Sequence, residues 1–281
     1  MTLEQLRRHG FGVAYRMLGS VADAEDVVQE ALLRLARQEP APAEPAAWLT
    51  TVTTRLAIGH LRLARVRRET YVGPWLPDPL VDDATATVER AESLSQAFLV
   101  LLERLTPVER AAFLLRDVFE YDYAAIADIV GKSEANARQL VTRARRRIAD
   151  GRPRFDADAA HRQALLERFL AAAEEGDLRG LESLLADDAV LYSDGGGKVS
   201  AARRPIHGAG RIARFMAGVA RLRRKRGPYA AEVVRVNGQP GRVARGPDGA
   251  VWDVLSVDVA GGRIVAVRIV RNPEKLAHVS A

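Results

Sequence analysis

Apolar residues recur every three to four positions through most of the first 149 residues, which is the spacing of one face of an α-helix. This pattern predicts helices over residues 2–69 and again over residues 84–149. Between them, residues 72–83 are rich in Pro, Gly and Asp, and the helical spacing is interrupted. We therefore expect an all-α first half with one extended break.

The pattern changes in the second half of the chain. Two helical stretches from residue 159 are followed by a glycine loop at residues 194–198 and a helix around residues 209–220. Residues 254–259 then alternate between polar and apolar, the period of two of a strand, and Gly-rich turns flank this run. We expect an α+β domain with a curved antiparallel sheet, joined to the helical half by a linker at residues 154–159.

Length and composition narrow the class of protein. At ~100 to 200 residues per domain, 281 residues suggest two domains and allow three. The chain has no Cys, which excludes disulfides, cysteine-ligated metals and cysteine nucleophiles. No apolar run reaches the ~20 residues of a transmembrane helix and the N-terminus lacks a signal-peptide pattern, so we expect a cytoplasmic protein. A net charge of +6 makes a polyanionic partner plausible.

A helix–turn–helix corner is predicted near the end of the helical half. Thr106, Pro107 and Glu109 have the features of a helix start, and Gly131 with Ser133 can end one helix and cap the next. The polar positions of that last helix suit base edges near its start and phosphates near its end. The alternative is an ordinary helical hairpin with a solvated arginine face. The residues predicted to bind DNA here are Ser133, Glu134, Asn136, Arg138, Gln139, Thr142, Arg143, Arg145 and Arg146.

Two further surfaces occur in the first helical block. One helix carries an acidic strip that suggests a cationic protein partner, although acids near a helix start are also good caps. The next helix, over residues 48–68, carries hydroxyls with Arg55, Arg62 and Arg65 and follows a Pro-rich loop, which suits a single-stranded nucleic-acid backbone. The acidic strip consists of Asp23, Glu25, Asp26, Gln29 and Glu30.

Taken together, these motifs resemble a known family. Residues 23–30, 47–49 and 106–148 are similar to regions 2 and 4 of extracytoplasmic-function (ECF) sigma factors of bacterial RNA polymerase. Residues 71–79, 194–198 and 272–276 resemble the subgroup with a fused SnoaL-like C-terminal domain, the SigJ type. The resemblance implies two all-α sigma domains followed by an α+β SnoaL-like cone. The implied boundaries are region 2 at residues 1–70, a linker at 71–95, region 4 at 96–152 and the SnoaL-like regulatory domain at 159–277.

The resemblance also implies partners for each surface. The acidic strip would bind core RNA polymerase, the arginine helix over residues 48–68 would open and read the −10 promoter element, and residues 133–147 would read the −35 element. It implies a nucleoid-associated sigma factor that directs transcription initiation under the control of its own C-terminal domain. No enzyme activity, cofactor or metal is implied.

The rival hypothesis is a SnoaL-like enzyme that acts on a small apolar substrate and uses the helical half as a DNA-binding or dimerisation module. Catalysis in such a cone needs a pocket group that shuttles a proton, and the candidates are Asp253, Asp258 and His207. We expect Asp258 to face solvent because it alternates with Val257 and Val259, and we expect His207 to lie in a loop before Gly208. Nothing in the sequence resembles a paired acid and base, so catalysis is not expected. The pocket of such a cone could instead hold a small-molecule ligand without catalysis.

The linker and two motifs of the second half are expected to form a switch. Prolines hold the linker extended and present its apolar side chains with little entropy left to lose, so the linker needs a partner surface. We expect it to dock on the glycine loop, where Lys198 would meet Asp78, and to close the molecule until polymerase and promoter open it. The switch residues are Trp75, Leu76, Pro77, Asp78, Pro79, Asp194, Gly195, Gly196, Gly197, Lys198, Asn272, Pro273, Lys275 and Leu276.

Overall fold

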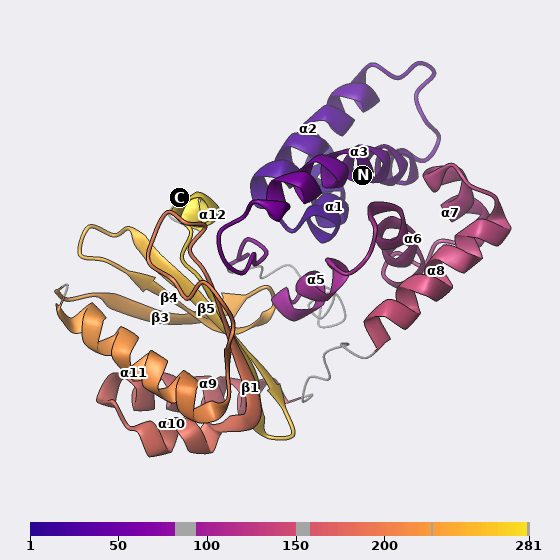
Figure 1. Ribbon diagram of the computed structural model, residues 1–281. Coiled ribbons are helices and arrows are strands. Elements are labelled where there is room, and N and C mark those ends of the chain that lie inside the picture. The colour runs from indigo at the N-terminus through magenta and orange to yellow at the C-terminus, as the bar shows by residue number, and fades with distance from the viewer. Residues whose placement is uncertain (82–93, 150–157, 226, 280–281) are drawn as a thin grey trace. The chain divides into compact units, whose positions relative to one another are not determined.

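The computed structural model describes residues 1–81, 94–149, 158–225 and 227–279, without the side chains of residues 65–68. Contacts divide the chain into two compact units (Figure 1). Unit 1 joins residues 1–70 with residues 98–152, and unit 2 joins residues 71–97 with residues 153–281. The helix expected over residues 84–93 and most of the linker at residues 154–159 lie outside the described residues. Among the described helices, none combines the length and apolar character needed to cross a membrane.

Unit 1 is helical, as the apolar spacing predicts. Its first three helices pack around Leu6, Ala31 and Leu49, and its last three around Ala112 and Ile126, all of them buried. The helices are α1 (Leu3–Leu18), α2 (Val21–Ala36), α3 (Pro45–Glu69), α6 (Pro107–Asp117), α7 (Tyr123–Val130) and α8 (Glu134–Ala149). A short helix, α5 (Gln96–Leu102), begins in unit 2 and ends in unit 1.

The helix–turn–helix corner forms where the local sequence predicts it. Thr106 and Glu109 make a reciprocal capping box at the start of α6, with proline in the first turn. Helix α7 ends at Gly131, whose φ of 65° is left-handed and therefore favours glycine. The Ser133 hydroxyl then accepts a hydrogen bond from the Asn136 amide at 3.3 Å, which caps α8.

Unit 2 is a six-stranded sheet with helices on one face, in the strand order β2-β1-β6-β5-β4-β3. The strand pairs are antiparallel except β1 and β6, which run parallel. The expectation of a wholly antiparallel sheet is therefore wrong at this pair, because β1 lies between β2 and the last strand, β6, and runs in the same direction as β6. The elements are α9 (Ala159–Glu175), α10 (Leu178–Leu184), β1 (Leu185–Asp194), β2 (Ile206–His207), α11 (Ala209–Lys225), β3 (Ala230–Val236), β4 (Gln239–Arg245), β5 (Val251–Ala260), β6 (Arg263–Val270), α12 (Pro273–Leu276) and the 3₁₀ turn η1 (Ala277–Val279).

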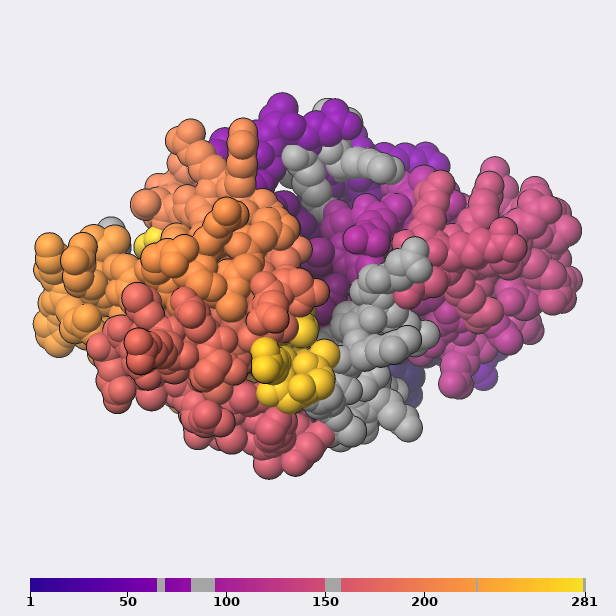
Figure 2. Space-filling model, turned by 60° about the horizontal axis from the view of Figure 1, so that its bottom comes forward, coloured from indigo at the N-terminus to yellow at the C-terminus, as the bar shows by residue number. Residues whose placement is uncertain are grey.

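The two faces of the sheet have different roles. Leu255, Val257 and Val259 of β5 point toward α9, α10 and α11 and form the core with Phe169 and Ile212. In Figure 2 the side chains of α9, α10 and α11, in salmon and orange, form a continuous surface over this part of unit 2. The alternate β5 positions face the other way, so the period of two in the sequence assigns both faces correctly.

Candidate nucleic-acid interface and linker-docking site

Helix α8 exposes all of the residues predicted to bind DNA from Glu134 onward, because its apolar stripe packs on α6 and α7. Several arginines of this helix nevertheless form ion pairs with carboxylates. Arg147 lies 2.6 Å and Arg143 3.8 Å from the Glu109 carboxylate, so the capping glutamate of α6 also neutralises two cations of α8. At the other end of the helix, Arg138 pairs with Glu134 at 2.5 Å. The arginines near the end of α8 thus receive their acids from α6, and Arg138 receives its acid from the first turn of α8 itself.

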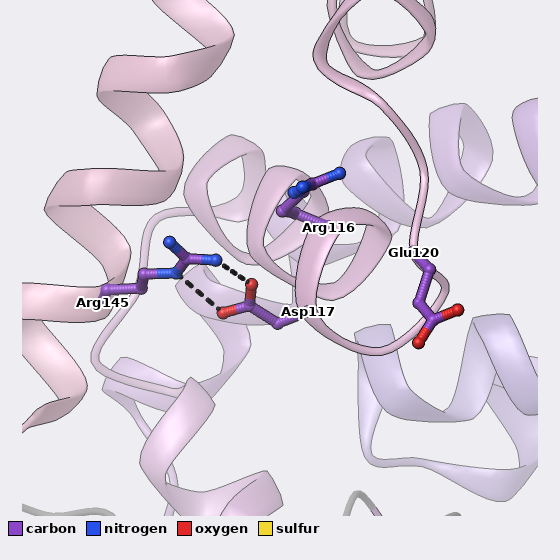
Figure 3. Close-up of a pocket in the computed structure, with 4 residues that line it drawn as sticks. All are labelled: Arg116, Asp117, Glu120 and Arg145. Carbon is purple, nitrogen blue, oxygen red and sulfur yellow. Dashed lines mark hydrogen bonds and ion pairs between the residues drawn. The ribbon is translucent and has the colours of Figure 1, made fainter.

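A hollow of about 570 Å³ lies beside this helix, lined by Arg116, Asp117, Glu120 and Arg145 (Figure 3). Asp117 of α6 holds Arg145 of α8 with two hydrogen bonds, of 3.1 and 2.5 Å. This hydrogen bonding to Asp117 raises the pKa of Arg145. Two cations and two acids line the hollow, so its charge is balanced and it offers no preference for an anionic or cationic ligand.

The acidic strip is exposed along α2, apart from Asp23, which is half-buried in the first turn. Glu30 makes an exposed ion pair with Arg34 at 2.8 Å. Ser20 caps the helix by accepting a hydrogen bond from the amide of Asp23. The side chains of Glu25, Asp26 and Gln29 point to solvent and are available to a partner.

Arginines connect the first three helices of unit 1 with its last three. Arg55 of α3 donates to the main-chain oxygens of Ile129 at 3.1 Å and Asp128 at 2.8 Å, at the C-terminus of α7. Arg110 of α6, only 2% exposed, donates two hydrogen bonds to the main-chain oxygen of Arg16 near the end of α1. Guanidinium groups at helix C-termini satisfy carbonyls that lack helical partners. Arg55, predicted to bind DNA, is thus engaged within unit 1; Arg62 is exposed, and the Arg65 side chain lies outside the described residues.

In unit 2, the start of the linker docks on Asp194 at the end of β1. The Asp194 carboxylate accepts hydrogen bonds from the Tyr71 hydroxyl at 2.5 Å, from the Leu76 amide at 2.8 Å and from the Lys275 ammonium at 2.9 Å. The side chain of Asp194 is fully buried. Burial, and then the hydrogen bond to Asp194, raise the pKa of Tyr71 well above its ordinary value. One carboxylate therefore ties both the linker and α12 to the sheet.

Lys275 of α12 forms the other half of this site. Its ammonium also donates to the main-chain oxygen of Leu76 and lies 4.2 Å from the ring centre of Trp75 and 5.2 Å from that of Tyr71. A desolvated ammonium over aromatic faces is a favourable cation–π arrangement. Leu76 is 1% exposed, so it is the apolar anchor of the linker, while Trp75 is only half-buried and covers the lysine.

The glycine loop lies against the linker, as expected, but Lys198 of this loop does not contact the linker residue predicted for it. A Cβ on Gly196 would stand 2.3 Å from Nδ2 of Asn272, and one on Gly197 would stand 3.1 Å from the Cβ of Val72. The expected pair between Lys198 and Asp78 is wrong. Lys198 pairs with Glu274 at 2.6 Å on the surface, and the Asp78 carboxylate lies 4.0 Å from Lys275. Asp78 is 5% exposed and could not meet a solvent-exposed lysine without leaving its site.

Several contacts of the linker carry no signal in the sequence. The amide and main-chain oxygen of Leu80 both bond Asn237, whose side chain also donates to the oxygen of Leu94. Gln96 bridges the oxygen of Pro77 and the hydroxyl of Ser256. Asn237 lies in a turn and Ser256 in a strand far along the chain, and Gln96 begins α5, so no local spacing predicts these contacts. Tyr71, which belongs to the linker motif, is the one additional docking residue that the sequence marks.

The three candidate catalytic groups of unit 2 are placed differently from the expectation. Asp258 is on the face that the alternation predicts but is 9% exposed, and it accepts a hydrogen bond from Arg268 of β6, so a solvent-facing position is wrong. Asp253 is 1% exposed and bonds Arg242, which is 2% exposed, as well as Arg223 of α11. His207 is exposed in strand β2, not in a loop.

Comparisons with known proteins agree with this architecture. Residues 2–67 match the family Sigma-70 region 2, and residues 95–148 match Sigma-70, region 4. The chain is 41% identical to the ECF RNA polymerase sigma factor SigJ of Mycobacterium tuberculosis over 97% of this chain and 91% of that protein. It is 31% identical to the probable ECF RNA polymerase sigma factor SigI of the same species, over 94% of this chain and 90% of that protein.

The similarity extends to structure. The crystal structure of M. tuberculosis SigJ matches 98% of this chain and 96% of its own, with a TM-score of 0.79 at 38% identity. Two sigma-type helical domains and a C-terminal α+β domain are thus shared along the whole length. The chain belongs to the family of ECF RNA polymerase sigma factors.

Proposed function

We propose that this protein binds core RNA polymerase and directs it to promoters by contacting the −10 and −35 elements, under the control of its own C-terminal domain. The observation that carries the proposal is helix α8, presented by a complete helix–turn–helix with its polar face exposed, in a chain related to ECF sigma factors over 97% of its length. A helix presented in this way fits the major groove of DNA.

The experiment that tests this proposal is reconstitution. Purified protein is mixed with core polymerase of a bacterium that carries a close homologue, and transcripts are mapped from a library of promoter fragments. We expect start sites that share a −10 and a −35 motif and that disappear without the protein. Transcripts independent of the protein, or failure to join the core enzyme, would refute the proposal.

The acidic strip of α2 supplies a sharper test of the polymerase contact. Asp26 and Glu30 are exposed, and substitutions at exposed positions usually change stability by ~0.5 kcal/mol or less. Asp26→Lys with Glu30→Lys should weaken binding to core polymerase while unfolding is unchanged. The matched control is Glu4→Lys, an exposed acid on α1 outside the strip. Equal affinities of the variant, the control and the original protein would contradict the assignment.

Control by the C-terminal domain is supported by the linker-docking site. The linker joins regions 2 and 4, and its residues from Tyr71 to Leu80 are tied to Asp194, Lys275 and Asn237 of unit 2. A linker bound along this length restricts how far regions 2 and 4 can separate. Release of the linker would therefore permit the separation that simultaneous contact with both promoter elements requires.

For the C-terminal domain we propose a regulatory role without catalysis. The two carboxylates that could shuttle a proton, Asp253 and Asp258, are buried in ion pairs with arginines. The apolar side chains between the sheet and its helices pack as one core cluster. Arginine side chains engage both carboxylates, so neither of them is presented to a substrate for proton transfer.

A further inference from the structure

Helix α11 of unit 2 carries a charge equal to the entire excess positive charge of the protein. It holds six of the 42 Lys and Arg residues and none of the 36 Asp and Glu residues, so its charge matches the net charge of +6. The rest of the chain is balanced. Charge concentrated on one helix, rather than spread over the surface, is typical of a binding face for a polyanion. The six cations are Arg211, Arg214, Arg221, Arg223, Arg224 and Lys225.

Four of these cations share one exposed face of the helix. At 3.6 residues per turn, Arg211, Arg214, Arg221 and Lys225 fall within a sector of roughly 80° and extend over about 21 Å. All four are exposed, and we call them the α11 basic face. Helix α11 lies in the orange part of the surface in Figure 2.

The opposite side of the helix is fixed in the core. Its apolar residues Ile212, Ala213, Met216 and Ala220 are buried, and the first three of them belong to the cluster formed with α9, α10 and the sheet. The basic face is therefore held on a rigid element. The same packing excludes insertion of α11 into a lipid bilayer, because an interfacial helix needs an apolar side free to enter the lipid.

The α11 basic face also keeps its charges unneutralised within the part of the chain that the structure describes. No ion pair within 4.0 Å joins any of its four cations to a described acid, although Glu182 of α10 lies beside Gly210 and close to Arg214. The remaining cations of the helix are engaged: Arg223 pairs with Asp253, and Arg224 bonds the main-chain oxygen of Glu174.

Helix α8 presents the opposite case. Its arginines at 138, 143, 145 and 147 each lie within 4.0 Å of a carboxylate. Exposed ion pairs are weak, at ~0 to 1 kcal/mol, but a phosphate must compete with them. Helix α11 therefore has more cations without an ion-pair partner among the described residues than helix α8 has, and these cations can bind phosphates.

We propose that the α11 basic face is a second DNA-binding surface, which contacts the phosphate backbone of duplex DNA without reading its sequence. Arginine suits this role because its planar guanidinium bonds phosphate oxygens in a fork and keeps its charge at any physiological pH. The choice of DNA rests on the proposed function, since promoter DNA is the polyanion on which a sigma factor acts. The face adds affinity to complexes in which α8 supplies the sequence preference.

The test measures binding of the full-length protein to fluorescent duplexes by anisotropy, over a series of salt concentrations. The variant is Arg214→Gln with Arg221→Gln. The matched control is Arg168→Gln with Arg179→Gln, which removes two exposed arginines from α9 and α10 of the same unit. Each phosphate interaction that a variant removes should lower the slope of log K against log salt by about 0.9. We expect the variant, but not the control, to show a slope smaller by about one to two on both promoter and random duplexes.

The outcomes separate this inference from the proposed function. A variant whose slope equals that of the control overturns the α11 contact, even if α8 still confers promoter preference. Conversely, a reduced slope in a protein that shows no promoter preference would overturn the proposed function and leave the α11 contact standing. Stronger competition by single-stranded RNA than by duplex DNA of the same length would overturn the assignment to duplex DNA.

Discussion

Asp194 illustrates how much of this molecule depends on single residues. Its buried carboxylate joins the end of β1 to two other segments of unit 2. It bonds the linker through Tyr71 and the Leu76 amide, and it bonds α12 through Lys275. A buried charge of this kind is stable only while its partner charge and hydrogen bonds are complete. Residues that maintain the pair therefore control the docking of the linker.

Replacing Asp194 with Asn should release the linker. The variant removes the nearer of two carboxylates that face the Lys275 ammonium and leaves only Asp78, at 4.0 Å. Breaking a buried pair costs about 3 to 5 kcal/mol. We expect a lower free energy of unfolding of unit 2 in denaturant titrations and faster proteolytic cleavage within residues 71–81. Asp187→Asn is the control, since Asp187 is solvent-exposed and pairs with Arg263 only at 3.8 Å. Equal cleavage rates of the two variants would show that Asp194 does not hold the linker.

Tyr71 predicts a pH dependence of the same contact. Burial, and then its bond to Asp194, raise the pKa of Tyr71, so the folded protein holds this proton more tightly than the unfolded chain does. The resulting stabilisation is complete below the ordinary tyrosine pKa of ~10 and is lost as the pH rises past it toward the raised value. In alkaline absorbance titrations, Tyr71→Phe should remove a tyrosine that ionises well above pH ~10. If the variant instead loses a tyrosine that ionises near pH ~10, the raised pKa of Tyr71 is contradicted.

At the scale of elements, α8 shows that exposure and availability are different properties. Its polar positions all face solvent, yet Asp117 and Glu109 of α6 hold three of its arginines. Arg146 is exposed and pairs with no acid in the described ranges. The helix therefore combines arginines that α6 positions with one that is free to move.

This distinction can be measured with substitutions in α8. Arg138→Ala or Gln139→Ala, near the helix start, should cost ~1 to 3 kcal/mol of promoter affinity and relax one base position. Arg146→Ala should instead weaken all duplexes alike and lower the salt slope by about one. Salt titrations on promoter and random duplexes separate the two effects. Identical behaviour of the three variants would exclude the proposed division between base and phosphate contacts.

At the scale of the whole molecule, the linker is the element through which the C-terminal unit can act on sigma regions 2 and 4. It is a continuation of region 2, yet its contacts assign residues 71–97 to unit 2. Within unit 1, Arg55 and Arg110 join regions 2 and 4 by hydrogen bonds to helix ends. In the proposed mechanism, a change in linker docking alters the tether between regions 2 and 4.

Trp75→Ala tests this coupling. The substitution removes the ring that lies 4.2 Å from the Lys275 ammonium and uncovers the docking site. We expect faster cleavage of the linker and a change in transcript yield from a cognate promoter in reconstituted reactions. Lys198→Gln is the control, because its exposed pair with Glu274 lies outside the docking site. Unaltered cleavage and yield in Trp75→Ala would mean that the linker is only a tether.

The sequence alone determined the features that depend on neighbours within a few residues. The capping box at Thr106 and Glu109, the left-handed Gly131 and the alternation along β5 specify local structure because their interactions are local. The linker motif, the glycine loop and the motif at residues 272–276 marked the residues of the docking site through their resemblance to a family. Lys275 and Asp194 were therefore among the predicted residues, although the bond between them was not.

Only the tertiary structure decided which charges meet. Lys198 and Asp78 have the right signs, but Lys198 stays on the surface while Asp78 is buried. Asp258 was predicted to face solvent, yet Arg268 from the next strand covers it. Packing between segments far apart in the chain determines which charged residues form pairs. Such pairs have no regular spacing in the sequence, so the sequence does not predict them. The local pattern therefore specified the elements, and burial selected the partners.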